Sequence, residues 1–217
     1  MMWEYTAPIQ RDSGAVAMIF NTPPVELKDH NIRNFNGDNF VWQSNIDDLV
    51  KKVSTRSSVY IESAMDFMTP PNPEDMSALR DSGGKIMVYH GVSDAIFSVQ
   101  DTETWYQALN AKNNGHASDF AQFYPVPGMG HCRGGQATDQ FDMLTPLVAW
   151  VEKGEKPTQV IATARGEGNP GGVNEELPVS WSATRTRPLC PYPSVATYDG
   201  NGNVESAKSF ACEVPLK

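Results

Sequence analysis

The stretch that decides the fold is Lys85-Ile86-Met87-Val88-Tyr89-His90-Gly91-Val92-Ser93-Asp94. Residues 86–90 form a short and nearly continuous apolar run, which is typical of a strand that is covered on both faces. The paired Gly83-Gly84 before it marks the end of a helix, because glycine adopts the left-handed conformation there without steric penalty. Residues 91–94 then form a loop at the carboxyl end of the strand.

Two helices are predicted upstream of this strand. Asn72 is a candidate N-cap for a helix that has Pro73 at its first position and ends at Gly83. Apolar residues recur at three- and four-residue steps over 46–53, which marks one face of another helix. The start of the chain is rich in proline, so we expect irregular structure there, with at most one strand near residues 16–20.

The alternation of strands and helices continues downstream. A helix is predicted over 99–111, an apolar strand over 120–126, a glycine-rich loop over 128–135 and a last helix along the apolar stripe of 141–151. Such alternation predicts an α/β fold, with a parallel sheet and helices on its faces. After Gly154 we expect an extended, irregular C-terminal tail that packs back on the domain without a second core.

Composition excludes several classes of partner. The chain has 217 residues, a size that can bury one core, and carries 17 basic against 26 acidic side chains, for a net charge of −9. We therefore expect no nucleic-acid partner, because a surface that follows phosphates must be basic. The longest purely apolar run, residues 15–20, is far shorter than the ~18 residues of a membrane span. Residues 1–5 lack the features of a secretory signal, so either the chain is cytoplasmic or its export signal lies on sequence outside it.

The chain contains three cysteines, Cys132, Cys190 and Cys212. An odd number leaves one of them free or paired with a thiol outside the chain. Cys190 and Cys212 are 22 positions apart, and a bridge between them would stabilise the fold by roughly 3 kcal/mol. The spacing alone leaves both this bridge and a pair of reduced, buried thiols open.

Asp94 and His131 are the candidate catalytic residues. Each follows a predicted strand, 37 positions apart, at the sheet edge where ligand chemistry gathers. A histidine that acts as a general base needs an acceptor on its other ring nitrogen, and a carboxylate fixes the tautomer and stabilises the imidazolium. Asp before His is also the chain order of α/β-hydrolases. The spacing by itself is equally compatible with loop caps and packing residues.

Other polar residues have simpler explanations. His90, at the end of a strand, has two interpretations, a residue that faces the active site and a hydrogen-bonded structural histidine, and we favour the second. His116, His131 and Cys132 lack the paired spacing of zinc ligands, so we expect no metal and no cofactor. The glycines of 128–135 lack the Gly-Lys-Ser/Thr of a phosphate loop, and we interpret them as a tight backbone path that presents His131.

Four segments together resemble the tannase and feruloyl esterase family. They are His90-Gly91-Val92-Ser93-Asp94, Gly128-Met129-Gly130-His131-Cys132-Arg133-Gly134-Gly135, Trp150-Val151-Glu152-Lys153-Gly154 and Arg187-Pro188-Leu189-Cys190-Pro191-Tyr192-Pro193. The resemblance, which covers about residues 75–212, implies an α/β-hydrolase core and a large lid domain. Residues 1–65 would be the end of the lid and the return to the core, and residues 66–217 the C-terminal part of a partial core.

The resemblance also implies roles for individual residues. Asp94 would be the acid and His131 the base of a catalytic triad. Cys132 matches a cysteine that bridges to a partner beside the nucleophilic serine, and that partner is absent from this chain. Cys190 and Cys212 match a second bridge. The implied activity is hydrolysis of carboxylic esters of aromatic (phenolic) acids by serine acyl transfer, with a small aromatic ester as substrate in a secreted or periplasmic enzyme.

The nucleophile is the point at which this sequence departs from the family. Residues 1–93 contain no Gly-x-Ser-x-Gly elbow and no Cys-Ser pair, and Ser13 has a glycine after it but none two positions before. We therefore expect a C-terminal portion of such an enzyme, whose serine lies on a missing N-terminal part. Two alternatives stay open. One is a truncated or binding domain without catalysis of its own, and the other is Ser13 recruited at a new elbow.

Overall fold

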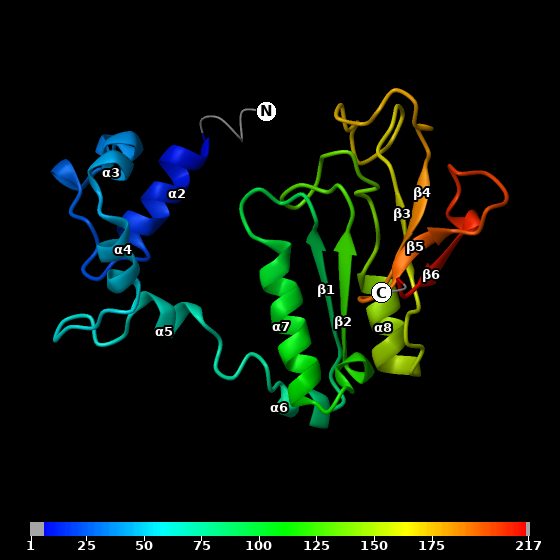
Figure 1. Ribbon diagram of the computed structural model, residues 1–217, viewed down its shortest axis with the longest axis horizontal. Coiled ribbons are helices and arrows are strands. Elements are labelled where there is room, and N and C mark those ends of the chain that lie inside the picture. The colour runs from blue at the N-terminus through cyan, green and yellow to red at the C-terminus, as the bar shows by residue number, and fades with distance from the viewer. Residues whose placement is uncertain (1–6, 216–217) are drawn as a thin grey trace. The chain divides into compact units, whose positions relative to one another are not determined.

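The computed structural model describes residues 7–215, and the chain divides into two compact units (Figure 1). The first unit runs up to Pro71 and the second begins at Asn72. The second unit contains all the strands. No helix within residues 7–215 is both long enough and apolar enough to cross a membrane.

The first unit is made of short helices. They are α2 (Ala7–Met18), α3 (Gly37–Gln43), α4 (Ile46–Val53) and α5 (Ala64–Met68), with 3-10 turns at Lys28–His30 and Ile32–Asn34. Each of α3, α4 and α5 begins with a polar cap, because the side chains of Asn36, Asn45 and Ser63 accept a hydrogen bond from a backbone N–H of the first turn. The helix predicted over 46–53 is confirmed.

The strand expected near residues 16–20 is wrong, because residues 16–18 belong to helix α2. A short apolar run does not distinguish a buried strand from a helix, and the two alanines of this run, Ala15 and Ala17, favour the helix. Ala17 is fully buried in this unit.

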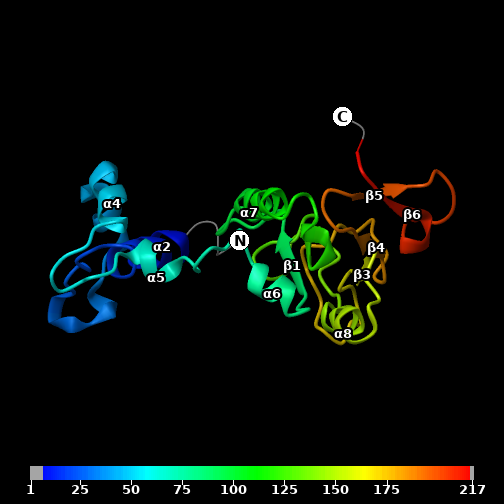
Figure 2. The ribbon, with the colours of Figure 1, turned by 90° about the horizontal axis from the view of Figure 1, so that it is seen from below.

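The second unit is built on two parallel strands with helices around them. Its elements up to the tail are α6 (Ser77–Asp81), β1 (Ile86–Gly91), α7 (Val99–Lys112), a 3-10 turn (Ala117–Asp119), β2 (Ala121–Val126) and α8 (Leu144–Lys153). β1 and β2 pair in register from Ile86 opposite Ala121 to Gly91 opposite Val126. α7 and α8 lie on opposite sides of β1 (Figure 2). Because β1 and β2 run parallel, their carboxyl ends meet at the same edge of the sheet, as the alternation of strands and helices predicted.

Helix α6 is shorter than predicted and starts later. Asn72 and Met76 both have positive φ angles, 50° and 46°, so the backbone turns before residue 77 instead of continuing as a helix from Pro73. An N-cap has an extended backbone, and Asn72 therefore does not cap this helix. The stop is as expected, with Gly83 at a φ of 80°. The last helix likewise begins at Leu144, not at residue 141.

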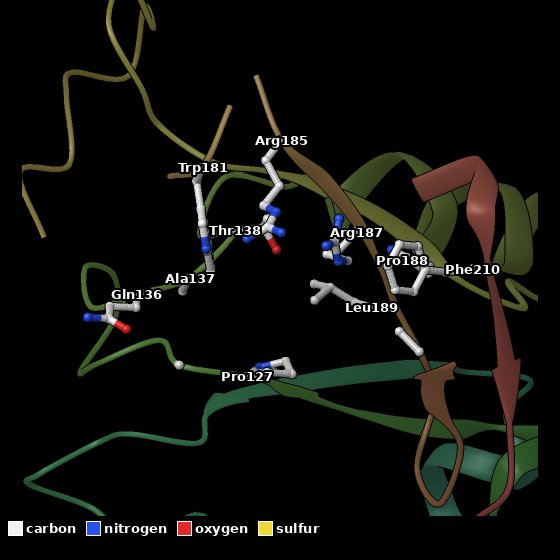
Figure 3. A pocket seen from close by; sticks show the side chains of 12 residues that line it. Pro127, Gln136, Ala137, Thr138, Trp181, Arg185, Arg187, Pro188, Leu189 and Phe210 are labelled. Atoms are coloured by element: carbon white, nitrogen blue, oxygen red, sulfur yellow. The ribbon is translucent and has the colours of Figure 1, made fainter. Parts of the chain in front are cut away.

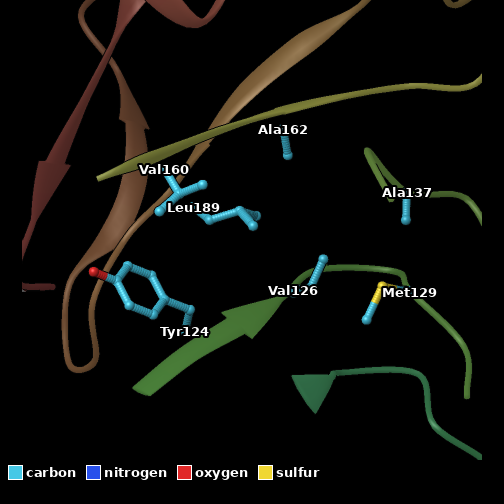
Figure 4. Close-up of a cluster of buried hydrophobic side chains, with 7 residues drawn as sticks. All are labelled: Tyr124, Val126, Met129, Ala137, Val160, Ala162 and Leu189. Carbon is cyan, nitrogen blue, oxygen red and sulfur yellow. The ribbon is translucent and has the colours of Figure 1, made fainter. Parts of the chain in front are cut away.

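The C-terminal tail packs back on the domain as expected, and its irregular chain contains four short strands. β3 (Val160–Thr163) pairs antiparallel with β4 (Thr186–Leu189), and β5 (Val195–Tyr198) pairs antiparallel with β6 (Phe210–Glu213). Each strand has only four residues, too few for a reliable alternation of apolar and polar side chains. Val160 and Leu189 pack on Tyr124 of β2, so the tail extends the core of the second unit (Figure 4).

Candidate active site

Asp94 follows β1 in a tight turn. Its backbone N–H donates to the carbonyl of Gly91 at 3.1 Å, and its Oδ1 accepts the N–H groups of Ile96 at 2.8 Å and Phe97 at 3.1 Å. The side chain is only 4% exposed. These bonds fix the carboxylate at the edge of the sheet. The other oxygen, Oδ2, is left for a partner outside this turn.

His131 lies on the loop of residues 128–135 that follows β2, which we call the histidine loop. Gly128 and Gly135, at the two stems of this loop, have φ angles of 73° and 75°, which favour glycine. The loop also crosses closely over the end of β1, because a Cβ on Gly91 would lie 2.4 Å from the carbonyl oxygen of Met129. Glycine at residue 91 is therefore what allows the histidine loop to approach the aspartate turn.

The two candidate residues are in direct contact. His131 Nδ1 lies 2.8 Å from Asp94 Oδ2, although the residues are 37 positions apart in the sequence. An ionised carboxylate is only an acceptor, so this hydrogen bond places a proton on Nδ1 and makes Nε2 the basic nitrogen of the neutral ring. The ring of Phe97 packs against the imidazole at a centroid distance of 5.3 Å.

The surroundings of Asp94 keep it ionised. Burial acts to raise the pKa of this carboxyl, but the hydrogen bond from His131 and the two backbone N–H groups outweigh burial and hold the pKa below its ordinary value. A carboxylate that stays charged and is almost fully buried can orient an imidazole and stabilise its protonated form.

His90 contributes a second imidazole to this carboxylate. Its Nε2 lies 3.4 Å from Asp94 Oδ2 and 3.1 Å from the carbonyl oxygen of Phe97, and its Nδ1 lies 2.8 Å from Thr102 Oγ1. The expected structural role fits these contacts, because both ring nitrogens have polar neighbours. The sequence did not predict its contact with Asp94, although a spacing of four residues across a strand end is compatible with it.

A buried ion pair stabilises the C-terminal end of the histidine loop, and no sequence motif indicated this pair. Arg165 forms a two-pronged contact with Asp139, with Nε 3.0 Å from Oδ1 and Nη2 2.7 Å from Oδ2. Asp139 Oδ2 also accepts the N–H of Gly134 at 2.7 Å, and Glu176 accepts the N–H of Gly135 at 2.6 Å. Asp139, Arg165 and Glu176 thus hold the C-terminal end of the loop that carries His131.

The cysteines lie in two different environments. Cys190 and Cys212 form a disulfide that joins the end of β4 to β6. Cys132 is exposed and is the free cysteine of the described residues. It stands next to His131 in the left-handed conformation, with a φ of 66°.

Two other residues from the sequence analysis, His116 and Ser13, have the following surroundings. His116 has a side chain that is 76% exposed and lies 3.5 Å from Asp119, and residues 7–215 contain no group of three or more His, Cys, Asp or Glu side chains that could hold a metal. Ser13 lies inside helix α2 and does not stand at a strand-to-helix elbow. The arrangement that remains is a carboxylate and an imidazole prepared for proton transfer.

Comparison with known proteins places this geometry in a family. The family model described as "Tannase and feruloyl esterase" matches residues 6–213. A mono(2-hydroxyethyl) terephthalate hydrolase of Piscinibacter sakaiensis is 48% identical over 166 residues, which cover 76% of this chain and 25% of that protein. A probable feruloyl esterase of Arthroderma benhamiae is 35% identical over 145 residues, which cover 65% of this chain and 25% of that protein. The chain thus spans about a quarter of the length of these relatives.

Solved structures agree on the fold. An esterase from Aspergillus oryzae superimposes with a TM-score of 0.60 at 23% identity, over 83% of this chain and 35% of that chain. A tannin acyl hydrolase from Aspergillus niger gives a TM-score of 0.54 at 17% identity, over 80% of this chain and 29% of that chain. The parallel strands and flanking helices are therefore a partial α/β-hydrolase core, and the chain belongs to the tannase and feruloyl esterase family.

Proposed function

We propose that this chain supplies the acid and the base of a carboxylic ester hydrolase that acts on esters of aromatic acids by serine acyl transfer. The observation that carries the proposal is the 2.8 Å contact between His131 Nδ1 and the buried carboxylate of Asp94. Both residues follow parallel strands at the edge where α/β enzymes place their chemistry.

The proposed reaction has two halves. In the first, a serine hydroxyl attacks the ester carbonyl, its proton passes to His131 Nε2, and Asp94 stabilises the imidazolium that results. The imidazolium returns this proton to the leaving alcohol as the ester C–O bond breaks. In the second half, His131 takes a proton from water, the resulting hydroxide attacks the acyl-serine, and the serine leaves with that proton to release the aromatic acid.

The attacking serine is proposed to lie on polypeptide outside this chain. The sequence has no nucleophile elbow, and Ser13 lies inside a helix. Cys132 supports the proposal, because an exposed thiol beside His131 is suitably placed for a bridge to a cysteine next to the missing serine. The proposed partner is therefore the N-terminal part of the same enzyme.

The substrate class and the location are proposed from the relatives and from the disulfide. The relatives are named for a terephthalate ester and for feruloyl esters, both of which are esters of aromatic acids. The Cys190–Cys212 bridge supports a secreted or periplasmic protein, because disulfides persist in oxidising compartments.

The test is a chimera in which this chain replaces the matching C-terminal quarter of the Piscinibacter sakaiensis hydrolase. Turnover of an aromatic ester by this chimera is compared with that of its His131→Ala variant, and we expect kcat to fall by at least about a thousandfold. His116→Ala, at an exposed histidine, is the matched control and should leave kcat unchanged. A His131→Ala variant that keeps activity within a few fold of the parent contradicts the proposal.

A second candidate function is a domain without catalysis of its own, which the missing elbow favours. A serine-directed fluorophosphonate probe, followed by mass mapping of the label, separates the possibilities when it is applied to both the isolated chain and the chimera. We expect no labelled serine in the isolated chain and one labelled serine in the chimera. A label on the isolated chain that depends on His131 would overturn the external nucleophile. A chimera that neither takes the label nor turns over ester would favour the second candidate.

A further inference from the structure

A cavity of about 340 Å³ lies between strand β4, the stem of the histidine loop and the start of β6 (Figure 3). Neither Asp94 nor His131 lines it. Its volume lies within the range of roughly 300–1,000 Å³ that is common for small-molecule sites. The cavity is therefore large enough for a ligand of its own.

Three side chains of β4 and its lead-in face this cavity. Arg185, Arg187 and Leu189 are two residues apart, so they leave the same face of the chain, and Figure 3 shows them directed toward the space that the cavity occupies. Pro127 and Phe210 line it as well. The cavity thus combines two guanidinium groups with apolar walls.

The two arginines differ in how their charge is balanced. Arg185 pairs with Glu205 at 2.8 Å and stacks on Trp181, with 3.9 Å from Cζ to the ring centroid. Arg187 stacks on Phe210 at 4.1 Å, and the one hydrogen bond of its side chain within residues 7–215 goes from Nη1 to the carbonyl oxygen of Thr186 at 2.7 Å. No carboxylate of the described residues forms an ion pair with Arg187.

The lining of the cavity itself supplies no negative charge. None of the lining residues is acidic, although the chain as a whole carries a net charge of −9. Burial, and after it the neighbouring Arg185 cation, lower the pKa of Arg187 more than the Glu205 carboxylate raises it, so the buried cation is held at a cost. A guanidinium remains charged in proteins, so an anion that enters the cavity relieves this cost.

We infer that this cavity binds a small carboxylate with a flat apolar body, such as a free aromatic acid. The planar fork of Arg187 matches a carboxylate with two parallel N–H···O bonds. The apolar walls formed by Leu189, Pro127 and Phe210 favour an aromatic body over a strongly hydrated inorganic anion. Binding of such a carboxylate by Arg187 and the apolar walls does not depend on ester hydrolysis.

The experiment is a titration of the intact chain with benzoate, followed by NMR. We expect saturable shifts at the Trp181 indole, the Leu189 methyl groups and the Arg187 Nε–H. Arg187→Met should weaken benzoate binding at least about tenfold, because a charge-assisted hydrogen bond is lost. Lys208→Met is the matched control, since it removes the same charge from an exposed position on the neighbouring segment outside the cavity, and should change binding less than twofold.

Two further variants complete the test, and three results would overturn the inference. His131→Ala should leave benzoate binding unchanged, which separates this cavity from the proposed catalytic pair. Arg187→Lys, which keeps the charge but loses the fork, should bind with intermediate affinity and carries the test if the methionine variant does not fold. Absence of saturable shifts at these residues, equal binding of inorganic phosphate, or equal weakening by Lys208→Met would each overturn the inference.

Discussion

The buried pair of Arg165 and Asp139 gives the sharpest prediction of stability. The Asp139 side chain is 0% exposed and that of Arg165 is 9% exposed. Arg165→Met would leave the carboxylate buried, with the backbone N–H of Gly134 as its remaining hydrogen-bond donor among the described residues. Breaking a buried pair from one side costs about 3–5 kcal/mol, because the charge left behind is uncompensated. We expect a loss of that size in the free energy of unfolding of the second unit.

The expected loss in the free energy of unfolding arises because Arg165→Met leaves the Asp139 carboxylate buried without its partner. A double-mutant cycle isolates this contribution. Asp139→Leu combined with Arg165→Met removes both charges at once, and we expect the double variant to be more stable than the Arg165→Met variant. Arg133→Met is the control, because Arg133 is exposed in the same loop and its loss should cost no more than about 0.5 kcal/mol.

Urea denaturation provides the measurement, with amide NMR signals of the second unit as the reporter. The Gly134 and Gly135 amides report the loop itself, since both donate to carboxylates. A loss below about 1 kcal/mol in Arg165→Met, as for an exposed ion pair, would refute the argument from burial. So would a double variant that is less stable than Arg165→Met.

Three further predictions concern the site and the tail. The pKa of Asp94 is lower in the folded chain than in the unfolded chain, where it is ~3.9, so its stabilisation is complete above that value and is lost as pH falls through the folded pKa. The stability difference between the parent and Asp94→Asn should therefore shrink in acid, and a difference that is constant with pH in urea titrations contradicts this. Replacing Cys190 and Cys212 by alanine should cost roughly 3 kcal/mol in the same assay, since the bridge closes a loop of 22 residues, and a loss below about 1 kcal/mol would count against it. Gly91→Ala places a Cβ 2.4 Å from a carbonyl oxygen of the histidine loop, and should lower the free energy of unfolding by about 1–3 kcal/mol. It should also remove the NMR signal of the His131 Nδ1 proton, and an unchanged signal would contradict the close approach.

Local signals were sufficient where an element is decided by neighbours in the sequence. The apolar run that became β1 and the glycines that end the preceding helix were predictable for this reason. The helix at Val99–Lys112 and the strand at Ala121–Val126 were likewise within a residue of their predicted bounds. Local signals failed at residues 16–18, where a short apolar run allowed both a strand and a helix.

Some contacts of the candidate site were likewise predictable from the sequence, and others were not. Two loops at the carboxyl ends of parallel strands must lie near each other, so the proximity of Asp94 and His131 was predictable from the alternation of elements. The contact of His90 with Asp94 was not, because it depends on how the turn after β1 folds back. The support from Asp139, Arg165 and Glu176 was not predictable either, since it joins loops that no motif connects.

The sequence by itself determined the strand–helix alternation, the two loops that carry Asp94 and His131, and the membership in a family, because these depend on residue types in short segments. The family resemblance already implied the bridge between Cys190 and Cys212, whereas only the tertiary structure decided that the tail forms strands against β2 and that Arg187 faces a cavity with no acidic lining residue. These features depend on residues distant in the chain coming within a few ångströms of one another. Packing sets such distances, and a linear pattern does not encode them locally.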